Sequence, residues 1–192
     1  MRLGILGGSF NPPHIGHLIV SSHISAELKL DRIVFVPTSV APHKVNNHTA
    51  SPDHRLAMLK LAVQGNPHFD VSDVELRRGG VSYSVDTLRL MKNAGHDDEL
   101  FLLIGMDNLI DFHTWKSPEE ILQLATVIVM TRPGFQVENV PPMMKDRVTV
   151  CSVPGIDISS REIRERANAG KPITYRVTRE VEEYILRNNL YR

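Results

Sequence analysis

Cysteine is almost absent from this chain. One of its 192 residues, Cys151, is a cysteine, which excludes an internal disulfide framework and a metal site built from several cysteines. The chain also has no excess of positive or negative charge, because 22 Lys and Arg balance 22 Asp and Glu. Proteins held non-specifically on nucleic acid or on an anionic membrane carry a broad positive field, which this composition does not supply. Any phosphate site must therefore be local.

Long hydrophobic runs are missing as well. No apolar stretch approaches the roughly 20 residues that a membrane-spanning helix requires, and residues 1–6 lead into Gly7 and Gly8 too early for the apolar part of a secretory signal. We therefore expect a soluble, cytoplasmic protein that has neither nucleic acid nor a membrane as a partner. Material for a core is abundant, since 42% of the residues are hydrophobic, and the length suits one domain over residues 1–192.

Short β-rich apolar runs alternate with stretches of helical periodicity, and no internal repeat or Gly/Ser linker separates them. Uncharged runs such as residues 126–130 are typical of parallel strands that are covered on both faces. Right-handed crossovers joining such strands predict an α/β fold with one doubly wound parallel sheet, which binds ligands at the carboxyl ends of its strands. The expected strands are residues 3–6, 33–36, 69–76, 100–104, 126–130 and 148–150.

Serine before proline marks two helix starts. Ser51 and Ser117 are expected N-caps, each followed by a proline at the first helical position, and Glu120 would complete a capping box with Ser117. Further helices are expected at residues 16–28, at 83–92 and within the C-terminal segment 159–192, which packs on the same domain.

The strongest local signal is the turn Gly-Gly-Ser-Phe-Asn-Pro-Pro-His-Ile-Gly-His at residues 7–17, between the first strand and the first helix. Gly7 and Gly8 let backbone N–H groups approach an anion, and the helix N-terminus adds unpaired N–H groups. His14 and His17 lie on one side of a turn and add donors, while Gly16 leaves room for a ligand oxygen. An ordinary tight turn would explain the glycines alone. The complete set indicates a phosphate site, although it matches neither the dinucleotide-binding pattern nor a P-loop.

A second signal is Ile-Ser-Ser-Arg-Glu-Ile-Arg at residues 158–164. A capping box of Ser159 with Glu162 explains why a helix starts here. It does not explain why Ser160 and Arg164 lie one turn apart on one face beside a helix N-terminus, where a hydroxyl and a guanidinium can bind phosphate. Alone, the motif leaves a structural and a phosphate-binding role open. Together with the histidine turn it favours phosphate binding.

The two motifs resemble those of the nucleotidyltransferases that share an H-x-G-H turn and an I-S-S-x-x-I-R helix, and within them the bacterial nicotinate-nucleotide adenylyltransferases. The resemblance covers essentially the whole chain, and Gly105-Met106-Asp107 matches a further G-x-D element. It implies a Rossmann-like single domain and transfer of the adenylyl group of ATP to nicotinate mononucleotide, giving deamido-NAD and pyrophosphate. Arg161 and Ser84 depart from the family, which usually has Thr at both positions.

The resemblance also implies roles for individual residues. His14, His17 and Arg164 are the expected catalytic residues. The expected ATP-binding residues are Gly7, Gly8, Ser9, Phe10, His14, His17, Gly105, Asp107, Ile158, Ser160 and Arg164. The expected nicotinate mononucleotide-binding residues are Lys44, Ser84, Val85, Trp115 and Arg132. We expect Mg²⁺ as cofactor, held mainly by substrate phosphates and not by a protein metal site. A homodimer is left open.

Some of these residues have plainer interpretations. Trp115 is the only tryptophan and would serve equally well in a core, while the family would stack it on the pyridine ring. Lys44 would ordinarily be a solvated lysine in an aperiodic segment, residues 40–50, which we expect to form a loop over the site. Arg132 follows a strand end and precedes a second expected loop at residues 134–145.

Three alternative functions remain open at this point. Phosphopantetheine adenylyltransferase has similar phosphate motifs, but the Asn-Pro-Pro-His form of residues 11–14 argues against it. A fragment of a class I aminoacyl-tRNA synthetase would explain His-Ile-Gly-His, but it would also need a K-M-S-K-S loop and an anticodon-binding domain. A nucleotide-sensing module without turnover would most simply show a damaged phosphate motif, and both motifs are intact.

Overall fold

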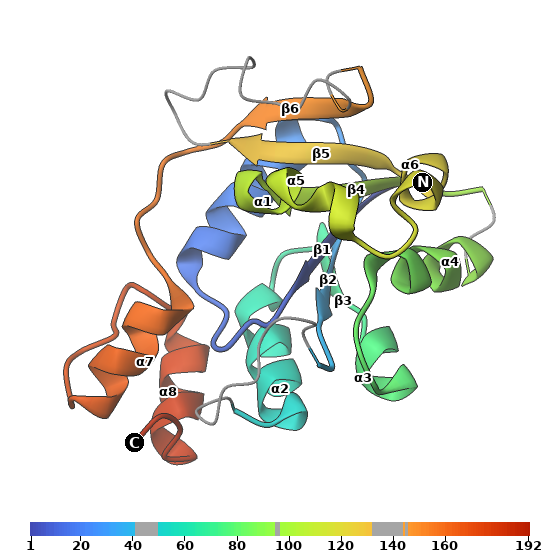
Figure 1. Ribbon diagram of the computed structural model, residues 1–192. Helices are drawn as coiled ribbons and strands as arrows, with labels where there is room; N and C mark the ends of the chain where they lie inside the picture. The colour runs from blue at the N-terminus through green and yellow to red at the C-terminus, as the bar shows by residue number, and fades with distance from the viewer. Residues whose placement is uncertain (41–49, 95–96, 132–143, 145) are drawn as a thin grey trace.

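A computed structural model describes residues 1–40, 50–94, 97–131, 144 and 146–192 (Figure 1). Its described residues form one sheet of six parallel strands in the order β3-β2-β1-β4-β5-β6, so the predicted doubly wound fold is confirmed. The strands are β1 (Arg2–Gly8), β2 (Arg32–Pro37), β3 (Phe69–Val71), β4 (Glu99–Gly105), β5 (Thr126–Thr131) and β6 (Val148–Ser152).

The strand order reverses beside β1. This strand pairs with β2 on one side and with β4 on the other. The chain builds β1, β2 and β3 toward one edge of the sheet, returns to place β4 against β1, and continues to the opposite edge. The segments that leave β1 after Gly8 and β4 after Gly105 therefore diverge. Such a switch point is where open α/β sheets bind their ligands.

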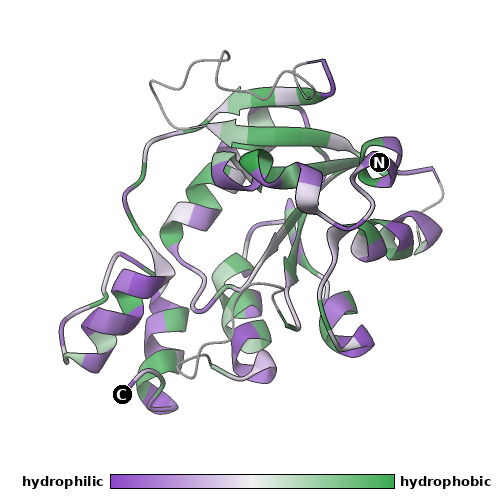
Figure 2. Ribbon diagram, viewed as in Figure 1, coloured by the Kyte–Doolittle hydropathy of each residue, from purple (hydrophilic) through white to green (hydrophobic). Residues whose placement is uncertain are grey.

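Helices cover both faces of the sheet, because successive strand residues point to opposite faces. On one face, α1 (Ile15–Glu27) and α2 (Pro52–Val63) pack against the sheet through side chains such as Ile24 and Leu59. On the other face, Leu88, Leu109 and Ile121 belong to α4 (Ser84–Ala94), α5 (Met106–Ile110) and α6 (Pro118–Leu124). Figure 2 shows the strands mostly in the hydrophobic colour and the helices striped, as this layering requires.

The C-terminal helices add a third cluster of apolar side chains. α7 (Ser160–Asn168) and α8 (Arg179–Arg187) lie beside α2 (Figure 1), where Ile163, Val181 and Ile185 bury themselves against Met58. Burying a side chain of this size contributes roughly 1.5–3 kcal/mol. This packing brings the start of α7 to the turn that follows β1. None of the helices in the described ranges is long and apolar enough to cross a membrane.

The two predicted Ser-Pro helix starts differ in the structure. Ser51 caps α2, and its hydroxyl accepts a hydrogen bond from the His54 N–H at 3.3 Å. Ser117 is the N-cap of α6 and Pro118 is its first helical residue, as predicted. Ser117 adopts a left-handed backbone conformation with φ 51°, however, and its side chain makes no capping hydrogen bond, so the predicted capping box is wrong. The Glu120 carboxylate pairs with Arg89 instead of closing a capping box.

The predicted box at α7 is half formed. Ser159 Oγ accepts a hydrogen bond from the Glu162 N–H at 3.1 Å, as expected for an N-cap. The Glu162 carboxylate, however, accepts from the Arg176 guanidinium at 3.2 Å instead of reaching back to the cap. The Glu162 carboxylate therefore binds the side chain of Arg176, 14 positions away, in place of the backbone N–H of Ser159.

The strand predicted at residues 69–76 ends at Val71. The residues after it form the short helix α3 (Val74–Arg78). The remaining short element, the 3₁₀ helix η1 (Phe112–Thr114), lies between α5 and α6. Alternation over so few residues does not distinguish a strand from one helical turn. Here Asp73 pairs with Arg77 one turn later at 2.8 Å, which favours the helix. The two predicted loops lie almost entirely outside the described residues.

Candidate active site

The histidine turn lies at the carboxyl end of β1, where the strand order reverses. His14 is the N-cap of α1, and its backbone N–H donates a hydrogen bond to His17 Nδ1 at 3.1 Å. The two imidazole rings stack with their centroids 3.6 Å apart and their planes at 29°. The spacing of three therefore brings the rings together, as the sequence predicts.

Burial decides the charge of both rings. It lowers the pKa of His14 from 6.5 to about 4. Burial is also the largest cause that lowers the pKa of His17 from 6.5 to about 3, with a smaller contribution from the neighbouring His14. Both imidazoles are thus neutral at pH 7 in the free protein. Because His17 Nδ1 accepts a backbone N–H, the neutral ring carries its proton on Nε2 and presents one donor.

The buried side chain of Phe10 supports the histidine turn from the side of the hydrophobic core. Phe10 has a positive φ of 44°, and its ring is 2% exposed, 5.1 Å from the His17 ring and 5.9 Å from Phe35, edge-on to each. The ring thus supports His17, and only the backbone of Phe10, a predicted ATP-binding residue, is available to a ligand. A Cβ on Gly16 would lie 3.0 Å from His14 Nδ1, so glycine makes room for this imidazole, where the sequence analysis expected a ligand oxygen.

Residues of α7 reach the same turn from the far end of the sequence. Ser160 Oγ donates a hydrogen bond to the Pro12 carbonyl at 2.7 Å, and Arg164 Nη1 donates to the Asn11 carbonyl at 2.8 Å. The two predicted phosphate motifs are therefore one assembly. The Ser160 hydroxyl holds the turn in place, while Arg164 has further N–H groups on its guanidinium that can bind an anion.

The other predicted ATP-binding residues frame the switch point. Gly7 is exposed, and a Cβ built there would meet nothing within 4 Å, which leaves open space above the end of β1. Gly105 ends β4 opposite and is the N-cap of α5, whose first turn carries the exposed Asp107. Ile158 packs against the cluster that joins α2, α7 and α8, so it contributes mainly to the placement of α7.

The predicted acceptor residues lie on the opposite face of the sheet. Ser84 is half-buried at the first position of α4. The Val85 side chain is fully buried in the core, so only its backbone can contact a substrate. Trp115 is half-buried, with its ring 5.2 Å from that of Phe112. This position supports packing and leaves part of the indole accessible. Lys44 and Arg132 lie outside the described residues.

The sequence analysis missed a group at Asn11. Asn11 Oδ1 accepts hydrogen bonds from the Tyr191 hydroxyl at 2.7 Å and from the Ala50 N–H at 3.1 Å. Nothing in the local sequence pointed to Tyr191, which is 180 positions away. Arg55 was missed too, although a charged residue on the apolar stripe of α2 that includes Leu59 is a signal that sequence reasoning can use.

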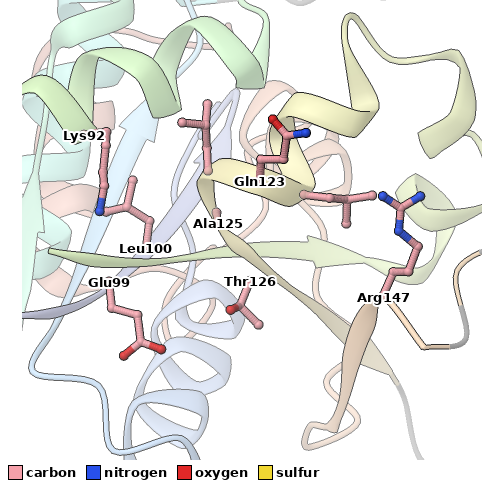
Figure 3. Close-up of a pocket in the computed structure, with 9 residues that line it drawn as sticks. Lys92, Glu99, Leu100, Gln123, Ala125, Thr126 and Arg147 are labelled. Atoms are coloured by element: carbon pink, nitrogen blue, oxygen red, sulfur yellow. The ribbon is translucent and has the colours of Figure 1, made fainter.

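A hollow of about 300 Å³ lies at the other end of the strands (Figure 3) and contains none of the predicted site residues. Glu99 and Thr126, the first residues of β4 and β5, line it. The cations beside it are already engaged, because Lys92 donates to the Asp98 carbonyl at 2.6 Å and Arg147 pairs with a carboxylate of α6. It therefore offers no competing site for phosphates.

Comparisons with known proteins found a matching family and relatives that align with nearly the whole chain. The family described as cytidylyltransferase-like matches residues 5–166. A probable nicotinate-nucleotide adenylyltransferase of Thermomicrobium roseum is 46% identical over 196 residues, covering 100% of this chain and 92% of that protein. The nicotinate-nucleotide adenylyltransferase of Bacillus subtilis is 40% identical over 190 residues, covering 99% of this chain and 98% of that protein.

Solved structures show the same fold at lower identity. The nicotinic acid mononucleotide adenylyltransferase of Plasmodium falciparum, complexed with NaAD, has a TM-score of 0.79 and 20% identity, covering 99% of this chain and 97% of that chain. A putative nicotinate-nucleotide adenylyltransferase from Vibrio parahaemolyticus has a TM-score of 0.71 and 22% identity, covering 100% and 96%.

Proposed function

The chain belongs to the cytidylyltransferase-like family, and within it to the nicotinate-nucleotide adenylyltransferases, and we propose that it transfers the adenylyl group of ATP to nicotinate mononucleotide. The products are deamido-NAD and pyrophosphate, and the reaction is a step of NAD biosynthesis. The observation that carries this function is the bond from Ser160 to the Pro12 carbonyl, which joins both phosphate motifs at the switch point.

The reaction is an in-line displacement at phosphorus. A phosphate oxygen of nicotinate mononucleotide attacks the α-phosphorus of ATP, and the bond to the departing pyrophosphate breaks. The second pKa of a phosphate monoester is about 6, so the attacking oxygen is largely deprotonated at pH 7 without a general base. Catalysis then consists of positioning and of stabilising charge as it moves onto pyrophosphate.

The residues of the histidine turn act on the reacting phosphates. His17 donates from Nε2, and the N-terminus of α1 adds backbone N–H groups and the positive end of its dipole. His14 stacks on His17. In this proposal it binds the same phosphates. Arg164 brings a full positive charge to the distal phosphates and holds them alike in the ground state and in the transition state.

The acceptor binds on the α4 side of the sheet. The hydroxyl of Ser84 and the backbone N–H of Val85, both at the start of α4, bind the carboxylate of the pyridine ring. Trp115 stacks on that ring. Lys44 and Arg132 contribute positive charge to the phosphates from segments that lie outside the described residues.

Mg²⁺ accompanies ATP in this proposal. In the part of the chain that the structure describes, no group of three or more His, Cys, Asp and Glu side chains could hold a metal ion. An ion bound mainly by substrate phosphates and water needs no such group. When bound, Mg²⁺ neutralises charge on the phosphates. A cytoplasmic location accords with the single, unpaired Cys151.

A pyrophosphate-release assay tests the function. ATP is supplied with nicotinate mononucleotide, nicotinamide mononucleotide or phosphopantetheine as acceptor. We expect turnover with the first, slower turnover with the second and none with the third. Preference for phosphopantetheine would assign the chain to the other adenylyltransferase family, and ATP binding without turnover would make it a nucleotide sensor.

A further inference from the structure

Two charged side chains are buried beside the active site, and the reaction steps above do not use them. Arg55 of α2 is 3% exposed and Glu75 of α3 is 4% exposed. Burying a charged group is unfavourable unless hydrogen bonds or an opposite charge compensate for the lost water. The contacts that these two residues make therefore indicate what they do.

Arg55 holds the backbone of two loops at once. Its Nη1 donates a hydrogen bond to the Ser9 carbonyl at 2.9 Å, and its Nη2 donates to the Ser39 carbonyl at 3.4 Å. Ser9 belongs to the histidine turn, and Ser39 follows the end of β2. The planar guanidinium can make both bonds in one fixed geometry, which an ammonium group cannot reproduce. Arg55 thus links the ATP-binding turn to the neighbouring loop.

Glu75 holds the start of α4, the helix at which the acceptor is proposed to bind. Its carboxylate accepts a hydrogen bond from Thr87 Oγ1, and Thr87 lies in α4, one turn after Ser84. Burial raises the pKa of Glu75, while the hydroxyls of Ser82 and Thr87 and the charges of Arg78 and Arg55 favour its ionised form. The carboxylate therefore ties the first turn of α4 to α3.

Hydrogen bonds also join the segment that Arg55 holds, after β2, to the segment that precedes α4. The Ser39 N–H donates a hydrogen bond to Ser82 Oγ at 2.9 Å, and the Ser82 N–H donates to the Val40 carbonyl at 3.0 Å. The segment that Arg55 holds is therefore bonded to the segment next to Glu75 and α4. The hydrogen bonds run from Ser9 through Arg55 and Ser39 to Ser82, which lies two residues before the first residue of the acceptor helix.

We propose that Arg55 and Glu75 are positioning residues that set the ATP-binding turn and the acceptor helix α4 at one fixed separation. This inference rests on the proposed function, because it requires ATP at the turn and nicotinate mononucleotide at α4. Reacting atoms must be held about 3–3.5 Å apart, and a misplacement of 1 Å can cost about 10²-fold in rate. Each substrate still binds its own half of the site when the connection is broken. Loss of the connection therefore lowers kcat and leaves both KM values nearly unchanged.

Two substitutions break the connection at its ends. Arg55→Lys keeps the charge and removes the fork that holds two carbonyls, and we expect kcat to fall by about 10²-fold. Thr87→Val keeps the shape and removes the hydroxyl that binds Glu75, and we expect kcat to fall by about 10-fold with both KM values within about 3-fold. Thr87→Ser restores the hydroxyl and should return kcat to near the wild-type value. Ile185→Val in α8, away from the site, controls for a small loss of stability.

The double variant tests the connection itself. If Arg55 and Thr87 act on one separation, the effects of Arg55→Lys and Thr87→Val on kcat combine less than additively. Additive effects would overturn the proposal, as would a normal kcat in Thr87→Val with a melting temperature lowered as in Ile185→Val. If Arg55→Lys does not fold, Ser82→Ala replaces it in the same cycle.

Amide hydrogen exchange provides a readout that does not depend on turnover. In Arg55→Lys we expect faster exchange in residues 81–87, on the other side of the connection, and unchanged exchange there would overturn the proposal. The proposed function can fail separately, since wild-type enzyme that prefers phosphopantetheine would still allow the kcat comparison with that acceptor. Normal wild-type activity with unchanged variants would refute the positioning pair alone.

Discussion

The hydroxyl of Tyr191, near the end of the chain, donates a hydrogen bond of 2.7 Å to Oδ1 of Asn11 in the histidine turn. Burial raises the pKa of Tyr191 well above that of an ordinary tyrosine, so the phenol stays protonated and remains a donor at every physiological pH. The segment after α8 therefore helps to hold the histidine turn, together with the bonds from α7.

Tyr191→Phe should weaken this hold. The change removes one partly buried hydrogen bond and leaves Asn11 Oδ1 with the Ala50 N–H, so we expect a loss of about 1 kcal/mol in the free energy of unfolding. Urea denaturation measures it. Tyr175→Phe is the matched control, because Tyr175 is 86% exposed and should change stability by less than about 0.5 kcal/mol. Equal stability of the two variants would mean that the Tyr191 hydroxyl does not stabilise the histidine turn.

His17→Ala should lower kcat by about 10²- to 10³-fold with a modest change in ATP affinity, the scale expected when one preorganised donor to developing charge is lost. His14→Ala should behave similarly. His68→Ala, on an exposed histidine just before β3, serves as the control and should retain normal kinetics. Near wild-type kcat at either turn position would show that this imidazole does not stabilise the transition state.

Arg164→Ala should mainly raise the KM for ATP, because a contact to distal phosphates is made in the ground state and in the transition state alike. The matched control is Arg161→Ala on the same helix. Arg161 has an 82% exposed side chain and pairs only with Glu165 among the residues described, so its removal should leave the KM unchanged. An equal effect of both substitutions would indicate a general loss of positive charge.

Trp115→Ala separates stacking from core packing. Because the indole is half-buried, the loss of stability should stay below the about 3–5 kcal/mol of a fully buried aromatic residue. If it stacks on the pyridine ring, the KM for nicotinate mononucleotide rises several-fold and that for ATP barely moves. Thermal unfolding is measured beside both KM values. A large drop in melting temperature with an unchanged acceptor KM would assign Trp115 to the core.

The pH dependence of stability should report the two histidines. Their pKa values are about 4 and about 3 in the folded protein, against 6.5 for an ordinary histidine. The unfolded chain therefore binds more protons than the folded protein as the pH falls below about 6.5. This contribution to stability is complete above that pH and is lost progressively down to about pH 4 for His14 and about pH 3 for His17. Urea denaturation of His17→Gln should show a shallower decline across this window. An identical decline would mean that His17 does not titrate as the structure indicates.

The sequence by itself determined the order of the strands along the chain and the nature of the site. Runs such as residues 126–130 carry no charge and can only be buried, and Ser51 and Ser159 cap helices through bonds to residues three positions away. Both predicted phosphate motifs can be recognised in the sequence because they too depend on residues that are close together along the chain. Each is a local arrangement of a helix N-terminus and side chains one turn apart, and their shared chemistry predicts that they meet.

Tertiary structure alone decided how the site is held and charged. The histidines are neutral because the fold buries them, and burial is a property of the whole chain. Tyr191 reaches Asn11 across 180 positions and Arg55 reaches Ser9 across 46, so no local pattern contains either bond. Glu75 in α3 finds Thr87 in α4 as its partner across 12 positions, which no local pattern contains either. Such contacts depend on which distant groups packing brings together, and neighbouring residues do not encode this.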